Sequence, residues 1–421
     1  MHAPLKLELS DFGRKLGGPT GINELMHDLG EALAINPQLL MMGGGNPGRI
    51  PAMEAVWRQR MTELLAHGDA FERMLAHYDQ PRGSPDFIAA LVHGLNQRYG
   101  WNLTPRNVCV TNGSQNSYFF LFNMLAGRSG TRHRKILLPL SPEYIGYADQ
   151  GLTDDLFVSC RPLIEELDAH TFKYRIDFDA LPLRNDLAAI CVSRPTNPTG
   201  NVLTDAEMRH LAALAKERGL FFLVDGAYGA PFPDIIFSDI QPFWDEHIVL
   251  TLSLSKLGLP GTRNGVVIAR EDVIETLSAI NSVVSLANGN LGQALVAPLL
   301  KNGELLRLSR EVIRPYYEQR ARQALGWLRT ALDGRVDYRL HAAEGALFLW
   351  LWLPGLKGTS QDLYRRLKAR NLLAVSGHHF FYGLNDPDWH HQHECLRLTY
   401  SQSEKIVHAG IEILADELAR G

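Results

Sequence analysis

One lysine of this 421-residue chain differs from the other basic residues because its sequence neighbours are all small or apolar. Lys256 lies in the stretch TLSLSKLGLPGTRNG, and Arg263, seven positions further on, is the nearest charged residue. A lone lysine is more often a solvated surface residue. An amine held among apolar groups near an arginine, however, has a lowered pKa and can act as a nucleophile. Lys256 could therefore bond covalently to a carbonyl compound.

Other polar groups follow short apolar stretches that are typical of buried strands. These stretches are residues 107–111, 188–193, 220–225 and 247–253. The groups at or just after their ends are Gly113, Ser114 and Gln115, then Asn197, then Asp225 and Tyr228, and finally Ser253, Ser255 and Arg263. Because ligands bind beyond the carboxyl ends of parallel strands, we expect these groups to surround one site.

The chemistry of these groups matches the parts of one cofactor. Glycine and serine at a helix start offer free backbone N–H groups to a phosphate, and Arg263 and serine hydroxyls could add to them. Asp225, at the end of a buried strand, needs a cationic partner. Asn197 and Tyr228 could donate to one oxygen anion, and Tyr144 could stack on a flat ring. A phosphate, a ring cation, an oxygen anion and a carbonyl for the amine together describe pyridoxal 5′-phosphate.

Several of these residues also have plainer interpretations. Asn197, in the string NPTG, is by itself a good turn former, and the glycines at 43–45 could serve any tight turn. Arg397 alternates with apolar residues in CLRLTY, so it could be an outward strand residue. The string WHHQHE at 389–394 has three histidines but no acidic or cysteine partner at a fixed spacing elsewhere. We expect a solvated loop there rather than a metal site.

Apolar strand-like runs alternate with amphipathic helices through the middle of the chain, which predicts an α/β fold with a largely parallel sheet. One helix starts at Thr204, which forms the pattern of a capping box with Glu207. A long helical pattern over residues 304–332 is expected to kink at Pro315. We expect an N-terminal arm (1–45, with a helix over 23–33), a large domain (46–303), and the linking helix with a small α+β domain (304–421).

The composition argues against several classes of partner and location. The net charge of −4 shows no basic surplus, which disfavours nucleic acid as a partner. No apolar run approaches the length of a membrane span. The first residues show no apolar signal core, and the four cysteines are too far apart for a disulfide framework or a metal site. We therefore expect a cytoplasmic protein.

Four strings, SLSKLGLPGTR, SRPTNPTG, VDGAY and CLRLTY, are similar to motifs of the fold-type I pyridoxal-phosphate aminotransferases. The resemblance covers nearly the whole chain. It implies a mostly parallel central sheet of the seven-stranded type, with helices on both faces and a smaller α+β domain. It also implies a homodimer whose subunits share their sites.

The resemblance implies a role for each matched residue. Lys256 would bond to the cofactor and then move a proton on the substrate, and Asp225 would pair with the protonated ring nitrogen. Tyr228 and Asn197 would bond the ring oxygen. The other expected contacts are Tyr144 on the ring; Gly113, Ser114, Ser253, Ser255 and Arg263 at the phosphate, with Gln115 beside them; Tyr78 at the phosphate of a partner subunit; and Arg397, Asn197 and Gly44 or Gly45 at the substrate. Ser376 departs from the family, in which a proline commonly stands before the glycine of this turn, so the turn could be less rigid.

Longer strings, among them PLSPEYIGYADQGLTDDLFVS and AYGAPFPDIIFS, resemble members of the family that exchange an amino group between valine and pyruvate. We expect that reaction, in two half-reactions through the amine form of the cofactor. Aminotransferases for aromatic or 2-aminoadipate substrates, and C–S lyases, stay open as alternatives because side-chain contacts decide the substrate. A transcription regulator with an aminotransferase-like domain is disfavoured, since the roughly forty residues before the glycines show no recognition-helix pattern.

Overall fold

The computed structural model of the chain describes residues 7–18, 20–23, 26, 28, 30, 36 and 38–420. The helix expected over residues 23–33 falls mostly outside these ranges. The α-helices are α1 (Asp11–Gly17), α3 (Pro51–Ala66), α4 (Ala70–Ala76), α5 (Pro85–Tyr99), α6 (Ser114–Leu125), α7 (Asp205–Glu217), α8 (Glu271–Ser285), α9 (Leu291–Lys301), α10 (Glu304–Leu308), α11 (Arg314–Leu332), α12 (Ser360–Ala369) and α13 (Glu404–Ala419).

The larger sheet has eight strands in the order β2-β11-β10-β9-β8-β4-β3, and β5 also pairs with β4. Its strands are β2 (Val108–Thr111), β3 (Gly127–Ser129), β4 (Arg132–Leu138), β5 (Phe157–Ser159), β8 (Leu187–Ser193), β9 (Phe221–Asp225), β10 (Ile248–Ser253) and β11 (Gly265–Ile268). Strands β10, β9, β8, β4 and β5 are parallel, whereas β11 is antiparallel to both of its neighbours. The expectation of a mostly parallel sheet is confirmed, and β3 adds a short antiparallel edge to the seven expected strands.

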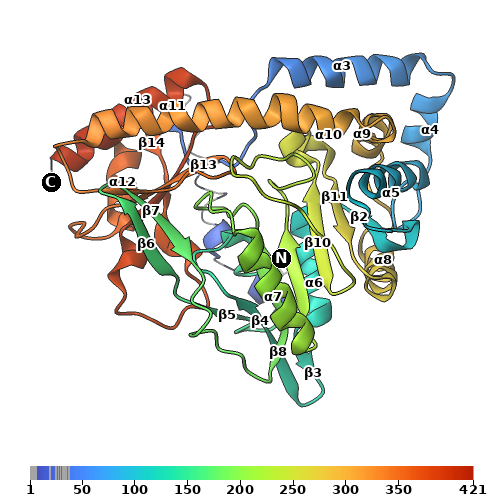
Figure 1. Cartoon of the computed structure of the whole chain (residues 1–421), viewed down its shortest axis with the longest axis horizontal. Helices are drawn as coiled ribbons and strands as arrows, with labels where there is room; N and C mark the ends of the chain where they lie inside the picture. The colour runs from blue at the N-terminus through green and yellow to red at the C-terminus, as the bar shows by residue number, and fades with distance from the viewer. Residues whose placement is uncertain are drawn as a thin grey trace, which may run out of the picture.

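Helices cover both faces of this sheet (Figure 1). Along β8, Ile190 packs into the core that contains α5, α7 and α9, whereas Cys191 packs into the core that contains α6 and α8. The alternation arises because successive strand residues point to opposite faces. The expected capping box of α7 is confirmed, since the Glu207 backbone N–H donates to Thr204 Oγ1 at 3.2 Å.

A second sheet combines strands from two distant parts of the chain, in the order β15-β16-β13-β12-β7-β6. Its strands are β6 (Leu163–Asp168), β7 (Thr171–Arg175), β12 (Arg339–His341), β13 (Phe348–Trp352), β15 (Val375–Ser376) and β16 (Cys395–Thr399); β1 (Leu40–Met41) and β14 (Leu372–Leu373) form a separate parallel pair. The β6–β7 hairpin lies inside the range expected for the large domain, yet β7 pairs with β12. The division at residues 45 and 303 stays a prediction.

A helical segment links the two sheets. In Figure 1, α11 runs across the top of the molecule from α10, beside the larger sheet, to α13. A π-helical turn, Ser309–Ile313, separates α10 from α11. Pro315 stands in the first turn of α11 and has no N–H to donate to the preceding turn, so the irregularity falls just before the proline. The expected kink at Pro315 therefore takes the form of a π turn.

The expectation of a solvated histidine loop is wrong for His391. This side chain is 3% exposed, its ring lies 4.8 Å from that of Trp389, and its Nε2 meets the Tyr174 hydroxyl at 2.5 Å. Burial lowers the pKa of His391 to about 3, so the ring is neutral.

Within the described ranges, no group of three or more His, Cys, Asp or Glu side chains is arranged to hold a metal ion. None of the described helices combines the length and apolar character that a membrane span requires.

Candidate active site

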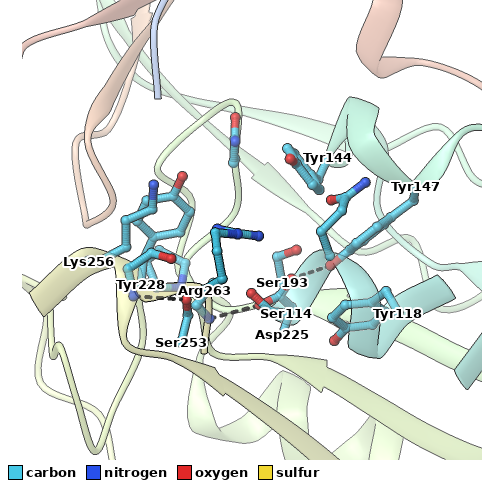
Figure 2. Close-up of a pocket in the computed structure, with 15 residues that line it drawn as sticks. Ser114, Tyr118, Tyr144, Tyr147, Ser193, Asp225, Tyr228, Ser253, Lys256 and Arg263 are labelled. Atoms are coloured by element: carbon cyan, nitrogen blue, oxygen red, sulfur yellow. Dashed lines mark hydrogen bonds between the residues drawn. The ribbon is translucent and has the colours of Figure 1, made fainter. Parts of the chain in front are cut away.

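A cavity of about 160 Å³ lies where the central strands β8, β9 and β10 end (Figure 2). These strands end at Ser193, Asp225 and Ser253. The cavity is lined by the expected residues Ser114, Gln115, Tyr144, Asn197, Asp225, Tyr228, Ser253, Ser255, Lys256 and Arg263, and in addition by Tyr118, Tyr147, Ser193, Pro195 and Ala227. The structure thus brings most of the expected cofactor residues to one edge of the parallel sheet.

Part of the cavity wall suits an anion. Helix α6 begins at Ser114, and its first backbone N–H groups have no acceptor within the helix. Gly113 has φ +101°, which favours glycine, and a Cβ there would lie 2.4 Å from Arg263 Nη2, so a larger residue would displace the guanidinium. Arg263 itself adopts the left-handed conformation, which is uncommon for residues other than glycine, at φ +53°. With the hydroxyls of Ser253 and Ser255, these groups fit a phosphate.

Asp225 supplies a buried carboxylate to the same cavity. The Tyr147 hydroxyl donates to its Oδ2 (Figure 2), and the Ala227 N–H donates to its Oδ1 at 2.8 Å. Burial raises the pKa of Asp225, and these two hydrogen bonds oppose that rise. In the part of the chain that the structure describes, no arginine or lysine forms a salt bridge with this carboxylate. Asp225 is therefore available to a cationic group in the cavity.

Lys256 is a primary amine with an unusually low pKa. Its Nζ donates to the Gly45 carbonyl at 2.6 Å and lies 5.1 Å from the ring centroid of Tyr228. Burial, followed by the guanidiniums of Arg397 and Arg263, lowers the pKa of Lys256 to about 8. A substantial fraction of the amine is consequently neutral near pH 7–8, which is the form that attacks a carbonyl carbon.

Arg397, on β16, is buried beside the cavity wall and does not point outward. Its Nη1 donates to Asn197 Oδ1 and its Nη2 to the Gly43 carbonyl, both at 2.7 Å. The guanidinium carbon lies 4.2 Å from the ring centroid of Phe348 and 5.2 Å from that of Phe380. Its Nε is buried and has no hydrogen-bond partner in the described structure. A buried guanidinium with a free N–H and no carboxylate is suited to a carboxylate ligand.

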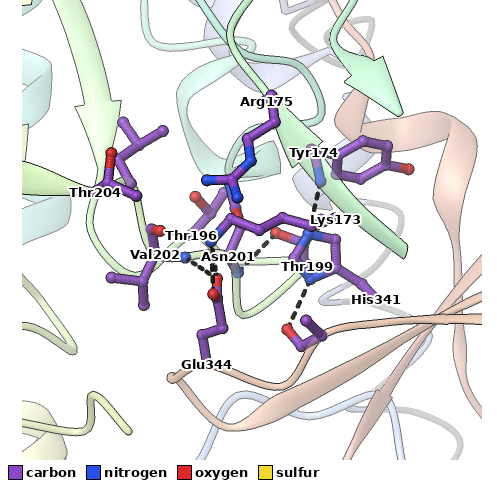
Figure 3. A network of polar contacts seen from close by, with 12 residues as sticks. Lys173, Tyr174, Arg175, Thr196, Thr199, Asn201, Val202, Thr204, His341 and Glu344 are labelled. Atoms are coloured by element: carbon purple, nitrogen blue, oxygen red, sulfur yellow. Dashed lines mark hydrogen bonds and ion pairs between the residues drawn. The ribbon is translucent and has the colours of Figure 1, made fainter. Parts of the chain in front are cut away.

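A buried ion pair holds the loop that carries Asn197 against the second sheet (Figure 3). Lys173 lies on β7 and Glu344 lies before β13, and the distance from Lys173 Nζ to Glu344 Oε2 is 2.5 Å. Lys173 Nζ donates to the Val202 carbonyl at 3.0 Å, and the Val202 N–H donates to Glu344 Oε2 at 3.0 Å. The pair therefore holds the loop between β8 and α7, which carries Asn197, against the second sheet, which also carries Arg397.

Lys173→Met is expected to lower the free energy of unfolding by about 3–5 kcal/mol, because it leaves the Glu344 carboxylate without its charged partner. Chemical denaturation followed by circular dichroism measures the change. Arg184→Met is the control: it breaks an exposed pair with Asp186 and should cost no more than about 1 kcal/mol. Equal effects of the two variants would contradict a structural role for the buried pair.

The structure also describes the surroundings of four other expected residues. Gln115 lines the cavity, and its side chain donates to the Gly146 carbonyl at 2.8 Å, so its amide also supports the turn that carries Tyr144. Tyr78 is 82% exposed and does not line the cavity of its own chain. Gly44 is buried and Gly45 is exposed, and of the two only Gly45 contacts Lys256.

Side-chain hydrogen bonds fix the turn at Ser376. Its Oγ lies 2.8 Å from Ser360 Oγ and 2.7 Å from His378 Nδ1, and Ser376 is 3% exposed. These contacts tie the turn to α12 and to the following 3₁₀ turn, Gly377–Phe380. The rigidity that a proline would supply here comes from a buried network.

Among the five additional lining residues, three carry a hydroxyl group that sequence reasoning did not predict at the cavity. Tyr147 ends the 3₁₀ turn Ile145–Tyr147, three residues after Tyr144, and that spacing was the available signal. Ser193 is the last residue of β8 and pairs in register with Asp225, so its place at the end of an apolar run was a second signal. Tyr118, whose hydroxyl accepts from Thr251 at 3.1 Å, lies inside an apolar helix, and no local pattern distinguishes it.

Comparison with known proteins places this site in a family context. The family profile "Aminotransferase class I and II" matches residues 53–414. The chain is 46% identical to the valine–pyruvate aminotransferase of Escherichia coli K12, over 98% of this chain and 99% of that protein.

Solved structures show the same similarity. The chain matches a structure from Psychrobacter arcticum 273-4 with a TM-score of 0.96 and 42% identity, and 99% of each chain is covered. It matches the valine–pyruvate aminotransferase of Salmonella typhimurium LT2 with a TM-score of 0.88 and 45% identity, covering 95% of this chain and 99% of the other.

Proposed function

The chain belongs to the class I and II aminotransferases, and from this premise we propose that it transfers the amino group between valine and pyruvate, giving 3-methyl-2-oxobutanoate and alanine. The observation that carries the proposal is a set of three charges at one cavity. Lys256 and Asp225 line this cavity, and Arg397 is buried beside it. Within the described residues, neither cation forms a salt bridge with a carboxylate, and Asp225 forms none with a lysine or arginine. Such a set can bind a cofactor with a cationic ring together with a substrate that carries a carboxylate.

The residues present fit pyridoxal 5′-phosphate. The start of α6, Arg263 and the serine hydroxyls suit its phosphate, and Asp225 suits its ring nitrogen. Tyr144 borders the cavity and would cover the ring, and Tyr228 and Asn197 would donate to the ring oxygen. When bound, the cofactor supplies an aldehyde for the amine and a ring that withdraws negative charge from the substrate Cα.

Each of these residues has a separate role in the proposed reaction. Arg397 binds the substrate carboxylate, and Asn197 holds the guanidinium in place through its Oδ1. Lys256, whose Nζ donates to the Gly45 carbonyl, would supply the amine that bonds to the cofactor and the base that takes the proton from the substrate Cα. Asp225 would hold the proton on the ring nitrogen, and the Tyr147 hydroxyl orients the carboxylate by donating to its Oδ2.

The uptake of pyridoxal 5′-phosphate by apoprotein should depend on pH through Lys256. Its pKa is lowered to about 8, so below that pH the amine is protonated and does not attack, and above it the amine is neutral. The uptake rate should therefore rise about tenfold per pH unit below pH 8 and level off above it. Stopped-flow absorbance measures the rate. A rate that keeps rising to pH 10 would indicate an ordinary lysine.

The substrate assignment is tested with a panel of donors and acceptors. Protein loaded with the cofactor is incubated with valine and pyruvate, and alanine is measured by chromatography. Absence of alanine, together with turnover of an aromatic donor or 2-aminoadipate, would replace the proposal by one of those activities. Pyruvate and a released thiol formed from a cysteine conjugate would indicate a C–S lyase. A DNA mobility shift would support the remote alternative of a regulator.

We also propose a homodimer in which Tyr78 reaches the partner's site. Tyr78 and Leu75 are exposed apolar residues in and just after α4, and Val283, Val284 and Leu286 are exposed at the end of α8. The segment after α8 is joined to the end of α4, since Asn290 Nδ2 donates to the carbonyls of Met74 and His77. Burial of such a patch favours association. Light scattering should give twice the chain mass, and Val283→Asp should reduce it to that of one chain; a wild-type monomer would contradict the proposal.

A reducing cytoplasm is the proposed location. All four cysteines are free and buried: Cys109, Cys160, Cys191 and Cys395. Buried free thiols are typical of proteins that fold without disulfides.

A further inference from the structure

Glu143 is a buried carboxyl group beside the cavity, and nothing in the proposed function uses it. It is 3% exposed, and in the described part of the chain it forms no salt bridge. Its Oε1 accepts from the Tyr144 N–H at 2.7 Å and from the Ser193 hydroxyl at 2.6 Å, and its Oε2 accepts from the Ser193 N–H at 3.0 Å. All three bonds go to residues that line the cavity.

These bonds join two walls of the site that belong to different segments. Tyr144 begins the turn that follows β4, whereas Ser193 ends β8 and pairs in register with Asp225. The ring of Tyr144 packs over Gly146, where a Cβ would be 2.4 Å from it, so the glycine leaves open the space that the ring occupies. In addition, the Glu143 N–H donates to the Phe380 carbonyl at 2.9 Å, beside Arg397.

The hydrogen-bond pattern requires a carboxyl group. Each oxygen of Glu143 faces a backbone N–H, which cannot turn away. Burial raises the pKa of Glu143 to about 8. A protonated Oε1 can still accept from Tyr144 and give its proton to the Ser193 hydroxyl, so both N–H bonds survive in either state. A glutamine cannot do this, because its NH₂ group would meet one of the two N–H donors wherever it is placed.

We propose that Glu143 is a positioning residue that holds Tyr144 at a set distance from the Asp225 edge of the cavity, by bonding the Tyr144 turn to the end of β8. The inference rests on the proposed function, because Tyr144 and Asp225 are the residues assigned to the cofactor ring. Glu143 itself touches neither cofactor nor substrate. Its effect is to fix the distance between Tyr144, which would cover the cofactor ring, and Asp225, which would bond the ring nitrogen.

The test compares Glu143→Gln with a matched control in the full chain. The control, Glu394→Gln, also removes a partly buried carboxylate that accepts a backbone N–H, from Gly355 at 3.0 Å, and a side-chain N–H, from Trp352 at 2.9 Å, but neither partner lines the cavity. Apoprotein of each variant is titrated with pyridoxal 5′-phosphate by absorbance. Circular dichroism in the visible range reports the asymmetric surroundings of the bound ring, and thermal unfolding of apoprotein reports stability.

Glu143→Gln should weaken cofactor binding about tenfold and reduce the visible circular dichroism, whereas Glu394→Gln should stay within about twofold of the wild type in affinity. Both variants should lower the unfolding temperature. An affinity within about twofold of the wild type and unchanged circular dichroism for Glu143→Gln would overturn the inference, whatever its stability.

A milder variant covers the case in which Glu143→Gln does not fold. Ser193→Ala removes one of the three donors to Glu143 and leaves both N–H bonds, so it should change affinity and circular dichroism in the same direction by a smaller factor. No change in either quantity would overturn the inference. A wild-type protein that binds the cofactor but forms no alanine from valine and pyruvate would overturn the proposed function and leave this comparison intact.

Discussion

Lys256→Ala is expected to abolish transamination while leaving the fold intact. The variant removes the amine that attacks the aldehyde and that later moves the substrate Cα proton, so two functions are lost together. General acid–base catalysis alone contributes about 10²–10⁴-fold, and loss of the covalent bond adds to it, so the rate should fall by about 10⁴-fold or more. The measurement is alanine formation from valine and pyruvate in the presence of excess cofactor.

The control for this variant is Lys216→Ala, which removes an exposed lysine near the end of α7 and should leave the rate unchanged. Borohydride reduction separates the two functions of Lys256, because it should attach the cofactor to the wild-type peptide that contains residue 256 and to no peptide of the alanine variant. Activity of Lys256→Ala within about tenfold of the wild type would refute the assignment, because a reaction that depends on a covalent bond to this amine cannot keep its rate without the amine.

The sequence predicts the place of a candidate site residue best where that residue directly ends or follows a strand. Asp225 and Ser253 are the last residues of apolar runs, and Lys256 follows the second of them within three positions. A run of buried residues predicts the strand, and parallel strands deliver their carboxyl ends to one edge. The expected cavity residues met at that edge because local pattern and topology agree there.

Other features depend on contacts that no local pattern contains. Tyr147 bonds Asp225 across 78 positions, and Glu143 bonds Ser193 across 50, so their roles appear only when β8 is placed beside β9 and the turn after β4. His391 stands in a polar string and yet packs among aromatic rings, because tertiary contacts override local composition. The β6–β7 hairpin similarly joins a sheet whose other strands lie far away in the sequence.

Asp225→Asn is expected to lower kcat/KM for valine by about 10²–10³-fold. Losses of this size are typical when an enzyme loses a fixed group that stabilises the charge of the transition state. The amide is isosteric, and its oxygen can still accept from the Ala227 N–H, so the loss should come from charge rather than from packing. Without the carboxylate, the ring nitrogen is no longer held protonated and withdraws less charge from the substrate Cα. Stopped-flow absorbance of the valine half-reaction measures the rate, and a cofactor titration measures binding separately.

Two comparisons make this prediction specific to the charge of Asp225. Tyr147→Phe removes the hydroxyl that donates to Oδ2 but keeps the carboxylate, so its effect should be smaller, on the order of tenfold. A cofactor analogue whose ring nitrogen carries a permanent methyl group stays cationic without help, and it should restore part of the rate in Asp225→Asn but not in Lys256→Ala. If Asp225→Asn kept its rate with the natural cofactor, the carboxylate would have no electronic role, and its burial against Tyr147 would be structural only.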